Sequence, residues 1–383
     1  MAWRQHAEHL AAAIVPAGSR WHQPLATVPR HVFLPCWWAV PDGATWGTWQ
    51  ARTGADDKTA WMAAAYRDAS LVTEIDRQHA DHARPGEILS GTPTSSSAMP
   101  RLVMRMLRHG QVYAGDDLLL IATGSGYSTA LAAQLLGDDH LTSVDVGPYL
   151  TAAAAARLAA IGLHPPVLCA DGTGPLPGTY DRIVSMTAVR PIPPTWLAAL
   201  RPGGRLVTVI SGTSLLLTAT ASGDGGTEGR IEWERITFMP ALPGDALPPD
   251  QQALIAAIGD QDGEEITRGR YPLGRVAPFG EVASMLEVAV PGIAHHYEED
   301  DGMRTAWMAH ADGSWARARA CGGELPLVHQ AGPRRLWDLL EEVRRDWLLT
   351  GRIPLYGAKA RVDPAGTIHL TQAGGTGWHG RID

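Results

Sequence analysis

Residues 117–127 read DLLLIATGSGY, an apolar run that leads into a turn of small residues and then into an Ala/Leu-rich segment ending near residue 136. An uninterrupted apolar strand is typical of the centre of a parallel sheet. Small residues let the backbone approach a ligand, and the first N–H groups of a following helix are free to bind it. The stretch therefore predicts a strand over 118–122, a ligand-binding turn and a helix.

The alternation of strands and helices continues on the C-terminal side of this stretch. We expect a helix over 149–160 and further strands over 141–146, 167–170, 182–186 and 205–210. Strands that alternate with helices predict an α/β fold with a doubly wound, mostly parallel sheet.

The segments before the apolar run differ from it in character. We expect an amphipathic helix over 2–15 and a short strand over 71–75. Small hydroxylated residues over 91–100 predict a loop, and Pro100 suits the first turn of the helix that follows. The N-terminal part is therefore predicted to be a largely helical extension.

The chain changes again after the proline-rich stretch 240–249. A hairpin is expected over 303–320 and a helix over 333–350, which together indicate a smaller α+β domain. The predicted organisation is an N-terminal extension (1–90), a core (91–240) and a C-terminal accessory domain (241–383).

Composition narrows the function classes. The net charge of −8, from 32 Lys and Arg against 40 Asp and Glu, argues against a general nucleic-acid binder. Cys36, Cys169 and Cys321 lack the spacing of a disulfide framework or a zinc site. His295-His296 and the acidic run 298–301 have no ligand-spaced partners, so we expect a solvated loop and no metal site. No long apolar stretch or signal peptide is visible, so we expect a cytoplasmic protein without a membrane span.

Acidic residues follow the next two expected strands. Asp145 ends one strand, where a carboxylate can accept both ribose hydroxyls of an adenosyl cofactor; a helix-capping role is the alternative. Asp171-Gly172 follows the next strand, where an acid can meet the adenine amino group. Open α/β sheets bind ligands at this edge. A nicotinamide enzyme would carry a third glycine in its turn, which is missing here.

Five motifs in matching order resemble those of the protein-L-isoaspartate O-methyltransferase family. They are Val28-Pro-Arg-His-Val-Phe-Leu-Pro35, Ala65-Tyr-Arg-Asp68, Ala122-Thr-Gly-Ser-Gly-Tyr127, Tyr180-Asp-Arg-Ile183 and Leu200-Arg-Pro-Gly-Gly-Arg-Leu206. The resemblance covers about residues 1–215. It implies a Rossmann-like class I fold that binds S-adenosylmethionine and methylates a carboxylate. The cofactor contacts it implies are Ala122, Thr123, Gly124, Ser125, Gly126, Tyr127, Asp145, Val146, Asp171, Gly172 and Thr187.

The sequence departs from the family pattern in the turn and in the active-site segment. Ala122 replaces the first motif glycine, and Leu120 stands where an acidic residue is usual. The active-site segment is Ser95-Ser-Ser-Ala-Met-Pro100, in which Ser96 takes the threonine position and Ala98 the serine position. Altered recognition of the substrate carboxylate is therefore expected.

The chain is also longer than the repair enzymes of the family generally are. Its serine-rich segment and C-terminal extension are similar to a divergent branch found with ribosomally made peptides, including lanthipeptides, lasso peptides and graspetides. The pattern from Arg335 to Gly366 looks most like the members found with ATP-grasp ligases. The resemblance implies methylation of an aspartate in a modified precursor peptide, after the ligase has acted, with subsequent aspartimide formation.

Methylation of a carboxylate asks for positioning more than for acid–base catalysis. The carboxylate is already ionised at pH 7, so no general base is needed. Hydroxyl donors orient it without neutralising it, which favours Ser95, Ser96 and Ser97 as the orienting residues; a flexible turn that caps the next helix is the alternative. Arg190 could bind an acidic peptide or could be an exposed, solvated side chain.

Two other functions fit the same residues. An isoaspartyl repair methyltransferase would share the cofactor site, but the serine segment and the extra domain argue against it. A non-catalytic module that binds S-adenosylmethionine or a peptide would keep the fold without turnover.

Overall fold

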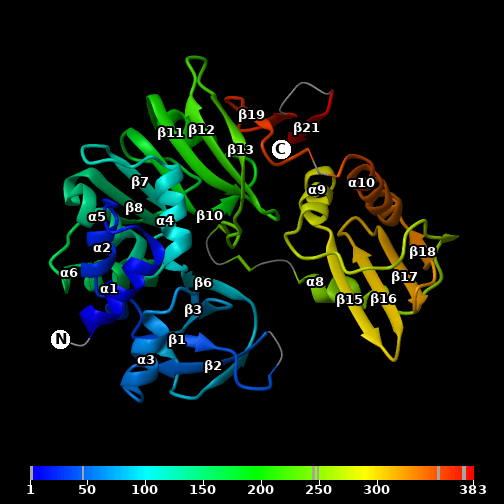
Figure 1. The fold of residues 1–383 in the computed structure, drawn as a ribbon, viewed down its shortest axis with the longest axis horizontal. Coiled ribbons are helices and arrows are strands. Elements are labelled where there is room, and N and C mark those ends of the chain that lie inside the picture. Colours follow the sequence, from blue (N-terminus) through cyan, green and yellow to red (C-terminus); the bar gives the residue numbers. More distant parts are fainter. Residues whose placement is uncertain (1–2, 45–46, 244–245, 248–249, 352–353, 373–376) are drawn as a thin grey trace.

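The computed structural model describes residues 3–44, 47–243, 246–247, 250–351, 354–372 and 377–383 (Figure 1). Its largest sheet has the strand order β21-β20-β19-β13-β12-β11-β10-β7-β8-β9. The five strands from β11 to β9 are parallel, as predicted for a doubly wound fold. They are β7 (Leu118–Ile121), β8 (Leu141–Asp145), β9 (Val167–Cys169), β10 (Tyr180–Val189) and β11 (Leu200–Ile210).

Helices cover this parallel part, and the sheet is buried between two apolar cores. The helices are α4 (Pro100–His109), α5 (Tyr127–Leu136), α6 (Pro148–Ala159) and α7 (Pro194–Ala199). All four residues of β7 are buried, because alternate side chains of a central strand enter opposite cores. Leu118 and Leu120 join one core, while Leu119 and Ile121 join the other. The predicted strand 118–122, its turn and its helix are therefore confirmed.

The other half of the sheet is antiparallel, which the sequence did not predict. It consists of β12 (Leu215–Ala221), β13 (Thr227–Arg235), β19 (Lys359–Val362), β20 (Ile368–Thr371) and β21 (His379–Ile382). The last three strands follow the C-terminal module in the chain and return to the core sheet through β13. Residues 241–383 are therefore not one separate domain.

The N-terminal part is a small antiparallel sheet with short helices, rather than a helical extension. Its helices are α1 (Trp3–Ile14), α2 (His22–Thr27), the 3-10 turns η1 (Arg30–Phe33) and η2 (Ala80–His82), and α3 (Lys58–Ala65). Its strands are β1 (Cys36–Ala39), β2 (Thr48–Thr53), β3 (Leu71–Ile75), β4 (Gln78–His79), β5 (Ile88–Ser90) and β6 (Pro93–Ser97). Residue 2 of the predicted first helix lies outside the described residues. The predicted loop 91–100 is largely strand β6, paired antiparallel with β3.

The C-terminal module contains a five-stranded antiparallel sheet in the order β14-β18-β17-β16-β15. Its elements are α8 (Gln251–Ala256), β14 (Glu265–Arg268), α9 (Glu281–Ala289), β15 (Ala294–Asp300), β16 (Met303–Ala309), β17 (Trp315–Cys321), β18 (Leu327–Ala331) and α10 (Leu336–Thr350). The predicted hairpin and long helix are β16–β17 and α10. Leu286 of α9 and Trp337 of α10 belong to the same apolar core as Leu119 of β7, so the module packs against the core sheet. No described helix is long and apolar enough to span a membrane.

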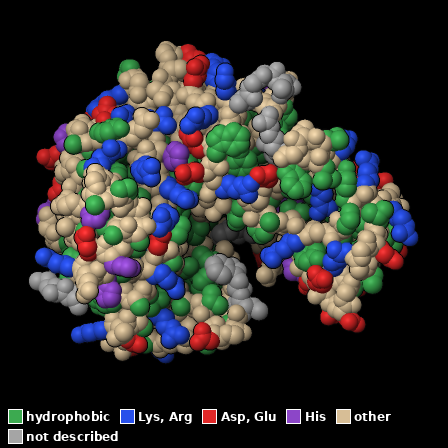
Figure 2. All heavy atoms as spheres, viewed as in Figure 1, with side chains coloured by type: hydrophobic (Ala, Val, Ile, Leu, Met, Phe, Trp, Pro, Cys, Tyr) green, Lys and Arg blue, Asp and Glu red, His purple; other side chains and the backbone are tan. Residues whose placement is uncertain are grey.

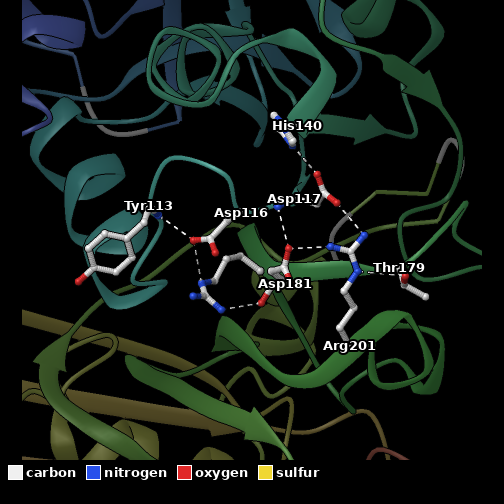
Figure 3. A network of polar contacts seen from close by, with 8 residues as sticks. Tyr113, Asp116, Asp117, His140, Thr179, Asp181 and Arg201 are labelled. Atoms are coloured by element: carbon white, nitrogen blue, oxygen red, sulfur yellow. Dashed lines mark hydrogen bonds and ion pairs between the residues drawn. The ribbon is translucent and has the colours of Figure 1, made fainter.

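A polar network links the amino ends of the parallel strands (Figure 3). Asp117, just before β7, accepts from His140 at 2.7 Å and pairs with Arg201 of β11 at 2.6 Å. Arg201 also donates to Asp181 of β10 at 2.7 Å. These contacts hold the pKa of Asp117 below its usual value, first through His140 and then through Arg201. Charged groups at this edge therefore cross-link strands, which leaves the opposite, carboxyl edge for a ligand.

The N-terminal sheet docks on α6 through a second polar cluster. Asp81 accepts from the Tyr149 hydroxyl at 2.8 Å and from Arg157. The buried ring of His79 lies 4.8 Å from the Tyr149 ring, and burial lowers the pKa of His79 to about 4. The exposed ring of His82 lies 4.2 Å from the Tyr149 ring at an angle of 60°.

This buried histidine predicts a loss of stability in acid. The unfolded chain binds a proton near pH 6.5 that folded His79 takes up only near pH 4, so stability falls as the pH drops through this window. The contribution is at most about 3 kcal/mol. Denaturant unfolding of wild type, His79→Gln and His82→Gln at a series of pH values measures it. The variant at 79 should flatten the pH dependence and the variant at 82 should not; the same slope in all three would contradict the assignment.

Candidate active site

A pocket opens at the carboxyl ends of the parallel strands. Its empty volume, open solvent included, is about 1050 Å³. Three walls surround it: the ends of β7, β8, β9 and β10; strand β6 of the N-terminal sheet; and the segment 238–242 after β13. Figures 1 and 2 show that the molecule is deeply indented between the N-terminal sheet and the C-terminal module.

The glycine-rich turn forms the floor of this pocket. Ala122, Gly124 and Gly126 all have left-handed backbones, with φ of 68°, 51° and 92°. A Cβ on Gly124 would lie 3.3 Å from the Ser96 carbonyl oxygen, so glycine lets strand β6 approach the turn closely. Ala122, Thr123, Gly124, Ser125 and Tyr127 line the pocket, whereas Gly126, the N-cap of α5, is not in the lining.

Buried hydroxyls hold the turn from beneath. Thr123 Oγ1 lies 2.7 Å from Ser143 Oγ, which in turn lies 3.0 Å from Thr129 Oγ1. These three side chains come from the turn, β8 and α5, and all are buried. The turn is therefore tied to both neighbouring elements before any ligand binds, which is the preorganisation that a binding site requires.

Asp145 is held rigidly at the end of β8. Its Oδ2 accepts from the Gly124 N–H at 2.9 Å, and its Oδ1 accepts from the Gly147 N–H at 3.0 Å. Burial raises the pKa of Asp145, while these two N–H groups act in the opposite direction. Each carboxylate oxygen can accept more than one hydrogen bond, so Asp145 can still receive ribose hydroxyls.

Asp171 has a different environment from Asp145. Its Oδ1 accepts from both the N–H and the hydroxyl of Thr173, at 2.9 and 2.7 Å, and its side chain is exposed. Val146, Asp171 and Gly172, which the sequence predicts as cofactor contacts, nevertheless line the pocket. A Cβ on Gly172 would lie 2.9 Å from Ile121 Cγ2, so only glycine fits there without a shift.

The three serines lie on strand β6, so they do not share one face. Ser95 and Ser97 are buried and Ser96 is half-buried, as expected when alternate side chains point to opposite faces. Ser95 Oγ lies 3.8 Å from the position of a Cβ on Gly124 and accepts from Thr73 Oγ1 at 3.2 Å, so its own hydrogen stays free to donate. Ser97 Oγ has no hydrogen-bond partner among the described residues.

The third wall was missed by the sequence analysis. Segment 238–242 runs beside the end of β10, where the Ala188 N–H donates to Met239 at 2.9 Å and the Ala241 N–H donates back to Ala188 at 2.7 Å. The hydroxyl of Thr187 also donates to the Met239 carbonyl, at 2.8 Å. Thr187 lines the pocket as predicted, but its hydroxyl anchors this wall.

Arg190 is not part of the pocket, contrary to the substrate-binding role considered for it. Its guanidinium donates to the backbone carbonyls of Glu287 at 2.9 Å and Asp383 at 3.0 Å. Partial burial lowers its pKa, although Glu287 and Asp383 act in the opposite direction. Arg190 therefore joins β10 to α9 and to the C-terminal residue.

Two arginines that the sequence analysis did not single out bear on the site. Arg77 lines the pocket from the β3–β4 turn. Arg30, within the first family motif, is fully buried and donates to five backbone carbonyls. These carbonyls belong to Ala65, Arg67, Ala69, Ser97 and Ala98, at 2.8 to 3.5 Å.

Arg30 therefore fastens the end of the serine strand to the segment after α3. Burial lowers its pKa to about 10, so the guanidinium stays protonated at neutral pH. The signal for this role in the sequence is the arginine of the Val28–Pro35 motif, whose partners are backbone atoms that no side-chain pattern reveals.

The residues at the pocket suit an adenosyl methyl donor. A rigid buried acid at the end of β8 suits a ribose, as in dinucleotide-binding folds. The left-handed turn before α5 and the tight fit at Gly124 provide the close backbone approach that such a ligand needs. Among the described residues, no group of His, Cys, Asp and Glu could hold a metal ion.

The left-handed backbone at Ala122 predicts a stabilising substitution. An L-residue in this conformation loses about 1–2 kcal/mol, and glycine removes that strain while gaining some freedom in the unfolded chain. We expect Ala122→Gly to raise the free energy of unfolding by up to about 1 kcal/mol and Ala122→Val to lower it. Denaturant titration of both variants checks the order; a destabilised glycine variant would contradict it.

Comparisons with known proteins agree with the site. The family model for protein-L-isoaspartate(D-aspartate) O-methyltransferase matches residues 55–244. The chain is 31% identical over 209 residues to the protein-L-isoaspartate O-methyltransferase of Anaeromyxobacter dehalogenans. This match covers 52% of the present chain and 96% of the Anaeromyxobacter protein. It is 34% identical over 112 residues to the Ignicoccus hospitalis protein of the same name, where the match spans 28% of this chain and only 53% of the relative.

A solved structure of a protein-L-isoaspartate O-methyltransferase has the same fold. It aligns with a TM-score of 0.51 and 15% identity, over 97% of this chain and 99% of that chain. The alignment extends past the core into the C-terminal part of the chain. The chain belongs to the protein-L-isoaspartate O-methyltransferase family, whose members are S-adenosylmethionine-dependent carboxyl O-methyltransferases.

Proposed function

We propose that this protein methylates the side-chain carboxylate of an aspartate in a ribosomally made, modified peptide, with aspartimide formation as the next step. The observation that carries the proposal is the serine strand beside the cofactor turn. Ser95 and Ser97 are buried and line the pocket, next to Ser96 and Ala98, which take the threonine and serine positions of the family pattern.

The chemistry at this site needs orientation of the acceptor. When bound, S-adenosylmethionine supplies a methyl group whose carbon–sulfur bond breaks toward sulfur as a carboxylate oxygen attacks. No proton moves, so no general base is required. Ser95 and Ser97 can each donate one hydrogen bond to the acceptor carboxylate without neutralising it, and the Arg30 contacts hold their strand in place. Catalysis then rests on alignment of the reacting atoms.

Three substrates test the proposal by mass spectrometry. They are a linear peptide with one aspartate and one glutamate, the same peptide with isoaspartate in place of the aspartate, and the aspartate peptide closed by an ester between the glutamate side chain and a hydroxyl residue, as an ATP-grasp ligase would make it. We expect the cross-linked aspartate peptide to gain one methyl group and then to lose methanol, which leaves it one water lighter than at the start. Preferential turnover of the isoaspartate peptide would contradict the proposal.

Serine variants test the orienting role. Loss of one hydrogen bond to a charged group predicts a fall in kcat/KM of roughly tenfold to a hundredfold for Ser95→Ala and for Ser97→Ala. Ser96 also lines the pocket, but its side chain alternates with those of Ser95 and Ser97 along the strand, so Ser96→Ala is the comparison variant and should lose less turnover. Equal losses of kcat/KM in all three serine variants would contradict the assignment of the orienting role to Ser95 and Ser97.

Isoaspartyl repair is the second candidate, and the relatives favour it. The Anaeromyxobacter protein is named as an isoaspartate methyltransferase, and it aligns with this chain over nearly its whole length. Repair also needs the same cofactor site. The isoaspartate arm of the experiment decides between the two acceptors.

A further inference from the structure

We propose that Arg77 is a specificity-determining residue that binds a second acidic group of the acceptor peptide, next to the carboxylate that is methylated. The inference deepens the proposed function and rests on it for the identity of the acceptor. Among the described residues that line the pocket, Arg77 has the one basic side chain; the acids there are Asp145 and Asp171.

The backbone places Arg77 at considerable local cost. Asp76 and Arg77 form the two-residue turn between β3 and β4, and both are left-handed, with φ of 43° and 67°. Glycine and asparagine are the usual residues in such turns. Strain of this kind persists where the surrounding structure requires a particular side chain at that point.

The buried carboxylate of Glu74 pairs with the Arg77 guanidinium and orients it. Arg77 Nη1 lies 3.7 Å from Glu74 Oε1, and the Glu74 side chain is only 8% exposed. Thr94 links the two residues, because its Oγ1 donates to Glu74 Oε1 at 2.7 Å and accepts from the Arg77 N–H at 3.1 Å. Thr94 directly precedes the serines, so Arg77 and the proposed acceptor-orienting hydroxyls share one wall of the pocket.

The guanidinium of Arg77 also contacts the linker that leads to the C-terminal module. Arg77 Nη2 donates to the backbone carbonyl of Ala246 at 3.1 Å. A carboxylate is a stronger acceptor than a neutral carbonyl, and bonds between two charged groups are roughly twice as strong. An acidic side chain that enters the pocket can therefore displace Ala246 from Arg77.

The group that Arg77 binds is not the methylated carboxylate. Close pairing with a guanidinium would lower the nucleophilicity of that carboxylate, and the serine hydroxyls already suit its orientation. A neighbouring acidic residue of the same peptide can form an ion pair with Arg77, and the methylated carboxylate then keeps its nucleophilicity. The substrate class is therefore a peptide in which the methylated residue has an acidic neighbour.

Peptide binding without turnover tests this assignment. The probes are fluorescein-labelled Gly-Ala-Glu-Xaa-Gly-Glu-Ala, with Xaa as aspartate or isoaspartate, and counterparts with glutamine in place of both glutamates. Fluorescence anisotropy gives their affinities for wild type, Arg77→Gln, Arg77→Lys and Arg84→Gln in the presence of S-adenosylhomocysteine. Arg84 is an exposed arginine in the loop between η2 and β5, outside the pocket lining, and serves as the matched control.

We expect wild type and Arg84→Gln to bind the acidic peptide about tenfold more tightly than its glutamine counterpart. Arg77→Gln should lose this preference, and Arg77→Lys should keep part of it. Calorimetry should give all four proteins the same affinity for S-adenosylhomocysteine.

An undiminished preference in Arg77→Gln would overturn the inference, as would a wild type without any preference. Equal losses of peptide and S-adenosylhomocysteine affinity in Arg77→Gln would also overturn it, because Arg77 would then serve the methyl donor. The proposed function fails separately, if wild type selects the acidic peptide but methylates neither it nor the cross-linked peptide.

Discussion

Asp145→Ala is expected to weaken binding of S-adenosylmethionine by at least about a hundredfold, because two hydrogen bonds between a carboxylate and ribose hydroxyls are lost. The same substitution also frees the N–H groups of Gly124 and Gly147, which the carboxylate now holds at 2.9 and 3.0 Å. The turn should therefore lose both its ligand and part of its support. Isothermal titration calorimetry with S-adenosylhomocysteine measures the effect.

Two further variants separate binding from folding. Asp145→Asn keeps the shape and one acceptor oxygen, so it should fold normally and bind with intermediate affinity. Asp139→Ala removes an acid from the opposite edge of the sheet and should bind like wild type. Retention of wild-type affinity in a folded Asp145→Ala protein would remove Asp145 from the site.

Arg30→Met is expected to lower the free energy of unfolding by roughly 3–5 kcal/mol, because five backbone carbonyls lose a charged donor. The Arg67 carbonyl keeps its hydrogen bond from the Ala69 N–H at 2.8 Å. The methionine fills much of the space but cannot donate. The end of β6 loses its anchor at Ser97 and Ala98, so methyl transfer should also fall in the fraction that remains folded.

Arg30→Lys and Arg67→Gln are the companions of this variant. Lysine keeps the charge but cannot donate both to the carbonyls of residues 65–69 and to those of Ser97 and Ala98, so the loss of stability in Arg30→Lys should be intermediate. Arg67 is exposed, and its substitution should leave the stability unchanged. Chemical denaturation of the four proteins gives the order; an Arg30→Met protein as stable as wild type would show that the hydrogen bonds to Arg30 do not support the fold.

The parallel core could be predicted from the sequence because its signals are local. Residues 118–121 are continuously apolar and become a fully buried strand, and Asp145 and Asp171 follow strands that end at the same edge. Periodicity and turn residues report such elements within a few residues along the chain.

The remaining features depend on contacts between distant segments. Pairing with β3 turns the hydroxylated residues 93–97 into a strand, although small polar residues favour a loop. Strands β19 to β21 join the core sheet across a whole intervening module, and no local pattern indicates this. The roles of Arg30 and Arg77 depend on backbone carbonyls of other segments, which have no sequence signature.

The most direct measurement is the chemical nature of the methylated product. The protein is incubated in a sealed vessel with S-adenosylmethionine tritiated in the methyl group and with the cross-linked aspartate peptide. Methanol released by aspartimide formation is collected, and the peptide is then treated with mild alkali to release the methanol of any remaining ester. A methyl ester releases its label as volatile methanol, which the account predicts for wild type and, far more weakly, for Ser95→Ala. Label that stays on the peptide in alkali would show transfer to nitrogen or carbon and would contradict carboxylate methylation by this site.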